Sequence, residues 1–166
     1  SVIFGPGDSF FNRFAVLLKM SPLIFPLACP DSRFAPVYVG DVIDAFAHAL
    51  EHDATVGRRL DLCGPAEYTL KHLVEYTRDT LGMRQRIIGL ADGMSRLQAR
   101  ILGLMPGKPF TMDNYHSLQH ASVCQDNALP SLGITPTPIQ TVVPGYLAGG
   151  NARGRYDEFR RQSRRA

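Results

Sequence analysis

The chain of 166 residues is 45% hydrophobic and 20% charged, which is typical of one soluble globular domain with a real core. No stretch approaches the ~20 consecutive apolar residues of a membrane-spanning helix, and the first residues lack the basic-then-apolar pattern of a signal peptide. The net charge is +3, but six arginines against Asp157 and Glu158 give residues 153–166 a charge of +4. The remainder therefore sums to −1, which excludes a general affinity for nucleic acid.

The three cysteines, Cys29, Cys63 and Cys124, lie far apart and form no C-x-x-C pair. This spacing predicts neither a zinc site nor a disulfide scaffold. We therefore expect reduced, buried thiols and a cytoplasmic protein.

The first residues read as an apolar strand, Ser1–Phe4, that ends in the turn Gly5-Pro6-Gly7. Asp8 or Ser9 then begins a helix with an apolar face. Because the strand has no preceding turn or cap, we expect the chain to be the carboxyl-terminal piece of a longer protein. Residues 20–36 contain four prolines and are predicted to form a long irregular loop, anchored by Phe25 and Leu27.

Residues 33–50 carry the clearest strand-to-helix signal. Val37–Val39 is predicted as a strand, Gly40 as a turn, and Asp41 as the N-cap of the next helix. The apolar positions Val42, Phe46, Ala49 and Leu50 share one face, which is expected to pack on a core. On the polar face, His48 and His52 lie four residues apart, but with no third ligand nearby we expect solvated histidines and no metal site.

Further elements alternate along the rest of the chain. Strands are predicted at 59–63 and 86–90, and a helix runs from its N-cap Thr69 to its terminator Gly82. Asp92 caps a helix whose inward residues are predicted to be Met94, Leu97, Ile101 and Leu104. Short helices follow at 111–120 and after Thr137-Pro138, the latter disturbed by Pro144-Gly145. The alternation indicates an α/β fold with parallel strands, too few to close a sheet without an addition.

Four segments in order indicate a family: residues 1–8 (SVIFGPGD), 33–42 (RFAPVYVGDV), 63–76 (CGPAEYTLKHLVEY) and 132–139 (LGITPTPI). From Ser1 to about Leu147 the chain resembles the second half of an atypical extended short-chain dehydrogenase/reductase (SDR). The superfamily is that of the NAD-dependent epimerases and dehydratases, and the branch includes the NAD(P)H-binding accessory subunit of respiratory complex I and its bacterial relatives. The resemblance implies a Rossmann-like fold of which the chain holds the last parallel strands and a small helical substrate lobe (residues 1–150). The dinucleotide-binding half would precede it.

The reactive motifs of that family are absent from this chain. No G-x-G-x-x-G or G-x-x-G-x-x-G occurs, and no tyrosine is followed four residues later by lysine. We therefore assign no catalytic residue, and expect the fragment alone neither to bind NAD(P)H tightly nor to transfer hydride.

The resemblance implies seven site residues. Ser1, Val2 and Ile3 would run beside the nicotinamide, although Val2 stands where sugar-nucleotide enzymes often have Asn. Arg33 would grip a substrate anion, with a surface charge as the alternative. A last group, Phe10, Phe11 and Tyr38, would line the cleft opposite the nicotinamide, with plain core packing as the alternative.

Two functions follow from the resemblance. The first is an oxidoreductase in which the full chain exchanges hydride between NAD(P)H and a carbonyl or quinone-like substrate. The alternative is a non-catalytic accessory or assembly protein of a respiratory complex, with a structural nucleotide and other subunits as partners. Residues 151–166 are expected to be a basic, disordered tail, whose alternative role is weak peripheral contact with anionic lipid at the inner face of the membrane.

Overall fold

The computed structural model describes residues 1–104 and 110–147. Its elements, in chain order, are β1 (Ile3–Phe4), α1 (Phe11–Met20), β2 (Ile24–Leu27), β3 (Arg33–Phe34), β4 (Val37–Tyr38), α2 (Val39–Glu51), η1 (Asp53–Thr55), β5 (Tyr68–Thr69), α3 (Leu70–Thr80), β6 (Arg86–Gly89), α4 (Asp92–Gly103), α5 (Met112–Leu118), η2 (Pro130–Leu132) and α6 (Ile139–Leu147). The predicted α/β class with parallel strands is confirmed, because β1 pairs with β4 and β2 with β6 in parallel. The third pair, β3 with β5, is antiparallel. The basic tail expected at 151–166 lies outside the described residues.

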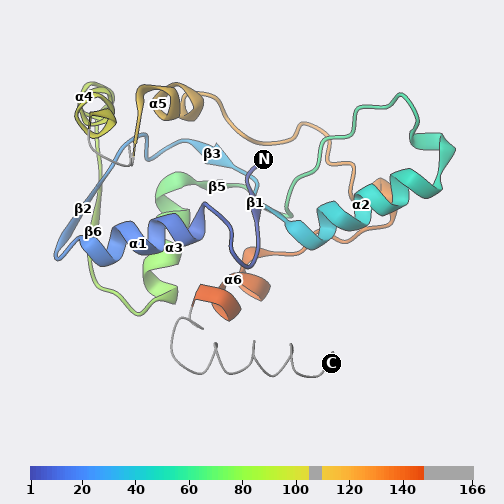
Figure 1. Ribbon diagram of the computed structural model, residues 1–166, viewed down its shortest axis with the longest axis horizontal. Coiled ribbons are helices and arrows are strands. Elements are labelled where there is room, and N and C mark those ends of the chain that lie inside the picture. The colour runs from blue at the N-terminus through green and yellow to red at the C-terminus, as the bar shows by residue number, and fades with distance from the viewer. Residues whose placement is uncertain (105–109, 148–166) are drawn as a thin grey trace.

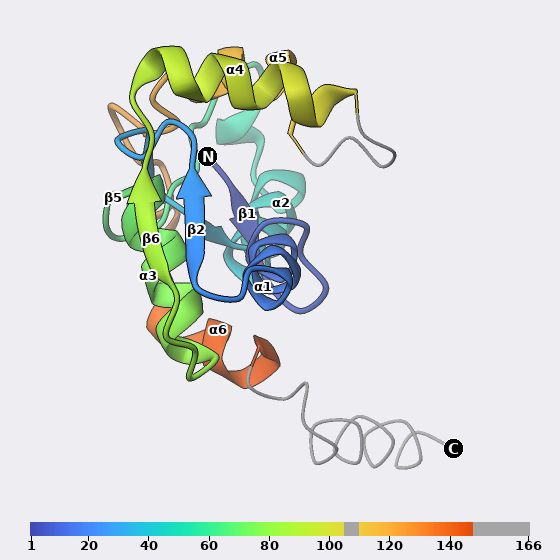
Figure 2. The ribbon, with the colours of Figure 1, turned by 90° about the vertical axis from the view of Figure 1, so that its left-hand side faces the viewer.

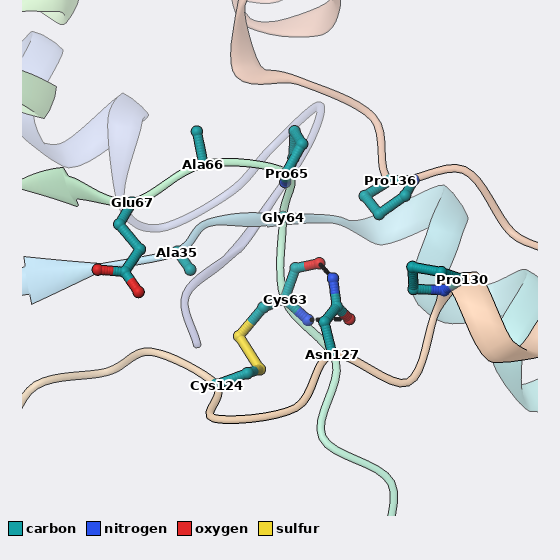
Figure 3. Close-up of a pocket in the computed structure, with 10 residues that line it drawn as sticks. All are labelled: Ala35, Cys63, Gly64, Pro65, Ala66, Glu67, Cys124, Asn127, Pro130 and Pro136. Carbon is teal, nitrogen blue, oxygen red and sulfur yellow. Dashed lines mark hydrogen bonds between the residues drawn. A yellow bond between two sulfur atoms is a disulfide. The ribbon is translucent and has the colours of Figure 1, made fainter.

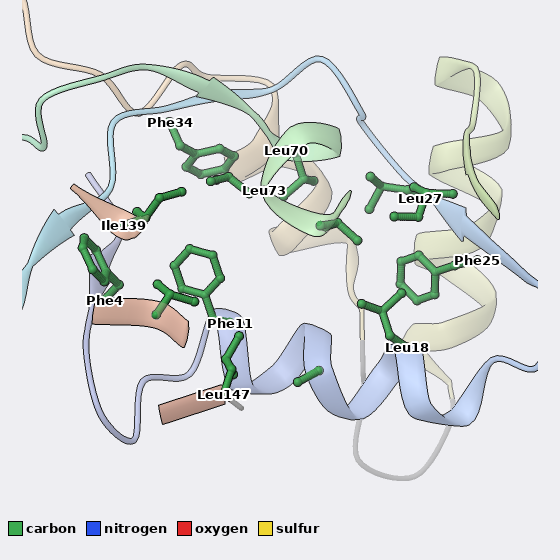
Figure 4. Close-up of a cluster of buried hydrophobic side chains, with 14 residues drawn as sticks. Phe4, Phe11, Leu18, Phe25, Leu27, Phe34, Leu70, Leu73, Ile139 and Leu147 are labelled. Atoms are coloured by element: carbon green, nitrogen blue, oxygen red, sulfur yellow. The ribbon is translucent and has the colours of Figure 1, made fainter. Parts of the chain in front are cut away.

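The core lies between α1, α3 and α6, which close around the inner faces of the short strands (Figure 4). Phe4, Phe11 and Leu18 have no exposed surface. The β2–β6 pair and α4 form one end of the molecule and α2 extends to the other, as Figure 1 shows. No helix in the described ranges is long and apolar enough to cross a membrane.

The helix predicted from Thr69 to Gly82 is confirmed as α3. The prediction succeeded because the residues that begin and end this helix act locally. The Thr69 hydroxyl accepts the N–H of His72 at 3.2 Å. Gly82 adopts a φ of +68°, a conformation that glycine takes at no steric cost, and so ends α3. Its apolar face is buried as the spacing predicts.

The irregular loop predicted at 20–36 is wrong, since β2 and β3 lie within it. Pro26 tolerates this position because β2 has one neighbour, β6, among the described strands, so the missing N–H breaks no ladder. The anchors Phe25 and Leu27 are buried as expected. The strand predicted at 59–63 is also wrong: this segment forms no regular secondary structure and pairs with none of the described strands.

Asp41 is not an N-cap. The helix starts earlier, at Val39, so Asp41 lies inside its first turn and is 5% exposed. Its carboxylate accepts the backbone N–H of Thr137 at 2.6 Å and the Thr137 hydroxyl at 2.8 Å. It therefore ties α2 to the start of α6.

Of the two predicted core-facing helix surfaces, the one on α2 is right only in part and the one on α4 is wrong. On α2, Val42 packs against the core as predicted, beside the buried Ala45, but Phe46 and Leu50 are 66% and 88% exposed. On α4, Met94, Leu97, Ile101 and Leu104 point outward, while Ser95 and Ala99 are fully buried. Small residues let α4 lie close to α5 and the end of β2, so helical periodicity identified the apolar stripe but not its direction.

The expectation of three reduced thiols is also wrong. Cys63 and Cys124 form a disulfide across 61 residues, and Cys29 is the remaining free cysteine.

Candidate functional site

The three residues expected beside a nicotinamide form the first strand and its entry. The Ser1 hydroxyl accepts the N–H of Ala35 at 3.0 Å, and the carbonyl of Val2 accepts the N–H of Val37 at 2.9 Å. On its other side, β1 has no neighbour among the described strands, and Ile3 is 51% exposed. The β1 edge is therefore an open sheet edge.

The two phenylalanines expected to line the cleft, Phe10 and Phe11, pack in or against the hydrophobic core. Phe11 has no exposed surface, so in this chain it borders no cleft. Phe10 is half-buried, with its ring 5.3 Å from that of Phe11 and 5.8 Å from that of Phe34. The structure thus brings Phe10 close to β3.

The two remaining predicted residues, Tyr38 and Arg33, lie on β4 and β3. Tyr38 is half-buried with its ring 5.7 Å from that of Phe4. It covers Gly40, where a Cβ would lie 2.4 Å from the ring, so this contact requires glycine. The guanidinium of Arg33, with 62% of its side chain exposed, pairs with Glu67. Because exposed pairs contribute at most about 1 kcal/mol, exchange of Glu67 for a ligand anion would cost little.

A hollow of about 330 Å³ opens beside β3 and the loop that follows the 59–63 segment (Figure 3). It is lined by Ala35, Cys63, Gly64, Pro65, Ala66, Glu67, Cys124, Asn127, Pro130 and Pro136. Gly64 is required here, since a Cβ would lie 1.8 Å from the carbonyl oxygen of Pro36. None of the seven predicted residues lines this hollow.

Asn127 and the disulfide shape its wall. The amide of Asn127 donates to the carbonyl of Cys63 at 2.8 Å and accepts the N–H of Cys63 at 3.2 Å, which replaces a strand partner. Sequence reasoning missed Asn127, Cys63 and Cys124, because nothing in their spacing indicates the contact. Glu67 is the only titratable side chain in the lining, so the hollow offers shape and backbone groups but no acid–base pair.

A second hollow of about 340 Å³ lies between the end of β2, α4 and α5. It contains Cys29, whose φ of +48° is unusual for a residue with a side chain. Burial raises the pKa of its thiol, which disfavours the reactive thiolate. The buried Ser95 hydroxyl accepts the N–H of Cys29 at 3.2 Å and so holds this turn.

At three helix N-termini in the described part of the chain, side-chain oxygens already accept N–H groups that a dinucleotide pyrophosphate would need. At α1, the Asp8 carboxylate already accepts the N–H groups of Phe10 and Asn12, at 3.0 and 3.2 Å. Thr69 occupies the same position at α3 and Thr111 at α5. Within residues 1–104 and 110–147 no His, Cys, Asp and Glu side chains are grouped as metal ligands, and the His48 and His52 rings stack on each other 4.0 Å apart.

The fold and the four motif segments indicate a class: they resemble the Rossmann-like proteins of the extended SDR type. A nucleoside-diphosphate-sugar epimerase from Staphylococcus aureus has the same fold, with a TM-score of 0.58 and 17% identity over 83% of this chain and 48% of that one. No protein-family model matches the chain.

Curated relatives narrow the class. The chain is 32% identical over 148 residues to "NADH dehydrogenase [ubiquinone] 1 alpha subcomplex subunit 9, mitochondrial" of Rattus norvegicus, covering 84% of this chain. It is 25% identical over 139 residues to the protein of that name from Arabidopsis thaliana. The chain is thus a homologue of this NADH dehydrogenase subunit, which confirms the resemblance that the motif segments predicted. It spans 38% of the rat relative's length and 35% of the plant relative's.

Proposed function

We propose that the chain is the substrate-lobe part of an NAD(P)H-binding, SDR-type protein that serves as an accessory subunit of a respiratory NADH dehydrogenase. The homology to subunit 9 proteins over 84% of the chain supports the partner. One structural observation carries the proposal that a nucleotide-binding half lies outside this chain: β1 has no neighbour on its outer side among the described strands. In this proposal the nucleotide-binding half belongs to the remainder of a longer protein, which fits the 38% of the rat relative that the chain spans.

The exposed face of α2 supports the same proposal. Ile43, Phe46 and Leu50 are 61%, 66% and 88% exposed, and a soluble domain rarely leaves such a row of large apolar side chains in water. In the longer protein we expect this face and the β1 edge to be covered by the preceding strands and helices. Ser1, Val2 and Ile3 would then border the nicotinamide, while Arg33, Phe10 and Tyr38 would belong to the substrate side, with Phe11 in the core beside Phe10.

A second candidate is hydride exchange between NAD(P)H and a carbonyl or quinone-like substrate. The fold shared with an epimerase favours it. Against it, the hollow beside β3 has only Glu67 as a titratable group, so any proton-transferring residue would come from outside this chain.

The experiment is purification of the full-length protein from its native cells. The accessory role predicts co-migration with the NADH dehydrogenase complex on native gels and release of one stoichiometric nucleotide on denaturation, without NAD(P)H oxidation by quinone or carbonyl acceptors. Turnover with such an acceptor would support the second candidate instead. Absence of both nucleotide and co-migration would refute the proposal.

The proposal that the apolar face of α2 is covered in the longer protein is tested by Phe46→Asp in the full-length protein. Burying an unpaired carboxylate is expected to cost at least about 3 kcal/mol, measured by urea unfolding. The matched control is Val56→Asp, since Val56 is 76% exposed in the turn after α2 and should change stability by no more than about 0.5 kcal/mol. Equal small effects of both changes would mean that the α2 face stays in water.

A further inference from the structure

An apolar stripe runs along the outer side of α4. It consists of Met94, Leu97, Ile101 and Leu104, which are 53%, 48%, 54% and 89% exposed. The opposite side of the helix, Ser95 and Ala99, is fully buried against the molecule. Figure 2 shows α4 lying lengthwise along one end of the molecule, so the stripe forms a ridge.

Positive charge borders this stripe. Arg96 and Arg100 are exposed on α4, and neither forms an ion pair in the described part of the chain. Asp92, the one acid of the helix, accepts the hydroxyl of Tyr115. With Arg84 and Arg86, residues 84–104 hold four arginines and one acid, a net charge of +3, whereas residues 1–83 hold seven cations and ten acids, a net charge of −3.

The outer face of the neighbouring β2–β6 pair has a similar character. Ile24 and Ile88 are 54% and 45% exposed there, next to the exposed Arg86 in register with Ile24. The Gln98 amide donates to the carbonyl of Pro26 at 3.1 Å and fixes α4 across these strands. The apolar and basic surface therefore belongs to one end of the molecule, remote from the β1 edge and α2 (Figure 1).

We propose that α4 lies in the interface of an anionic lipid membrane. Its apolar stripe would face the boundary between headgroups and acyl chains, and its arginines would contact the headgroup phosphates. An apolar helix face bordered by unpaired basic residues is the pattern of helices that lie on membranes. At 12 residues α4 is about 18 Å long, which suits a position along the surface. The exposed Asp92 is the one acid of this helix, and the net charge of +3 over residues 84–104 complements anionic headgroups. The surface is separate from the region of the proposed nucleotide half, so this proposal stands or falls independently of the proposed function.

The test is co-sedimentation of the full-length protein with vesicles of phosphatidylcholine, with and without phosphatidylglycerol. Binding is expected to the phosphatidylglycerol vesicles and to weaken with salt. Leu97→Glu/Ile101→Glu should reduce this binding at least tenfold. Arg96→Gln/Arg100→Gln, which touches only exposed side chains, should reduce it by about fivefold for each arginine removed and flatten the salt dependence.

Two controls separate α4 from other sources of binding. Val56→Glu makes the same kind of exposed apolar-to-acid change at the other end of the molecule and should leave binding unchanged. A chain ending at residue 152 lacks the six terminal arginines and should retain the effect of the α4 changes. The proposal is overturned if neither vesicle binds, if the α4 variants bind like the parent, or if truncation alone abolishes binding. It is also overturned if the stripe variants lose a protein partner while vesicle binding is unaffected.

Discussion

Breaking the contact between Asp41 and Thr137 tests how α2 and α6 are held together. The carboxylate of Asp41 is 5% exposed and accepts two hydrogen bonds, from the N–H and the hydroxyl of Thr137. Hydrogen bonds to a charged group contribute about 1.5–3 kcal/mol each. Asp41→Ala removes both acceptors and is expected to lower the free energy of unfolding by about 3–5 kcal/mol. Thr137→Val removes only the hydroxyl, and we expect a loss of about 1–2 kcal/mol.

The assay is urea unfolding of the full-length protein, followed by far-ultraviolet circular dichroism. Asp44→Asn is the matched control, because Asp44 is exposed on the same helix and its change should cost no more than about 0.5 kcal/mol. The double variant Asp41→Ala/Thr137→Val should lose less stability than the sum of the two single losses, because both changes remove the same contact. Fully additive losses, or equal losses for Asp41→Ala and Asp44→Asn, would refute the reasoning.

Three further predictions concern stability. Reducing the Cys63–Cys124 disulfide, which links residues 61 positions apart, should lower the free energy of unfolding by about 2–4 kcal/mol. The measurement is the urea midpoint with and without dithiothreitol. An unchanged midpoint, with the bond in the untreated protein verified by mass spectrometry, would contradict this. Burial and the hydrogen bond to Asp8 raise the pKa of Tyr146, so the folded state holds this proton more tightly than the unfolded state does. The free energy of unfolding should therefore fall as the pH rises above about 10, the pKa of tyrosine in the unfolded chain. Tyr146→Phe should lack this fall between pH 9 and 11. Finally, the purified 166-residue chain should be poorly stable alone, because the β1 edge and the α2 face lack partners, and a cooperative melt at high temperature would count against this.

Local signals predicted the elements whose ends are fixed by local chemistry. Thr69 and Gly82 delimit α3 because a hydroxyl accepts a nearby N–H and a glycine adopts positive φ. The capping box of Thr111 and Asn114 likewise places α5 where it was expected. Such features depend on residues three or four apart, so a single sequence contains them in full.

Contacts across the chain were beyond that kind of reasoning. The role of Asp41 depends on Thr137, 96 residues later, and a carboxylate near a helix start reads as a cap in either case. Pro26 weakened the strand signal of β2, because only the fold reveals that this is an edge position. On α4 the periodicity was correct but the direction was not, because the molecule buries its small residues and turns the large ones outward.

The proximity of some candidate site residues followed from the motif segments. Ile3 and Tyr38 lie on the paired strands β1 and β4, and Ser1 and Val2 bond to Ala35 and Val37, because two motif segments form neighbouring strands. The hollow beside β3 depends on Asn127 and the disulfide, which no local pattern indicates. The segment Gly64-Pro65-Ala66-Glu67 was the available signal, as it carried the family resemblance and now lines that hollow.

The position of Tyr146 has a consequence for synthesis on the ribosome. Its hydroxyl donates to Asp8, the residue that organises the first turn of α1, across 138 positions. At about 5–20 residues per second, the first turn waits roughly 7–28 s for this partner to be translated. During that interval the segment around Asp8 should remain open to proteases and chaperones in the nascent protein, and it should become protected only after Tyr146 has been translated.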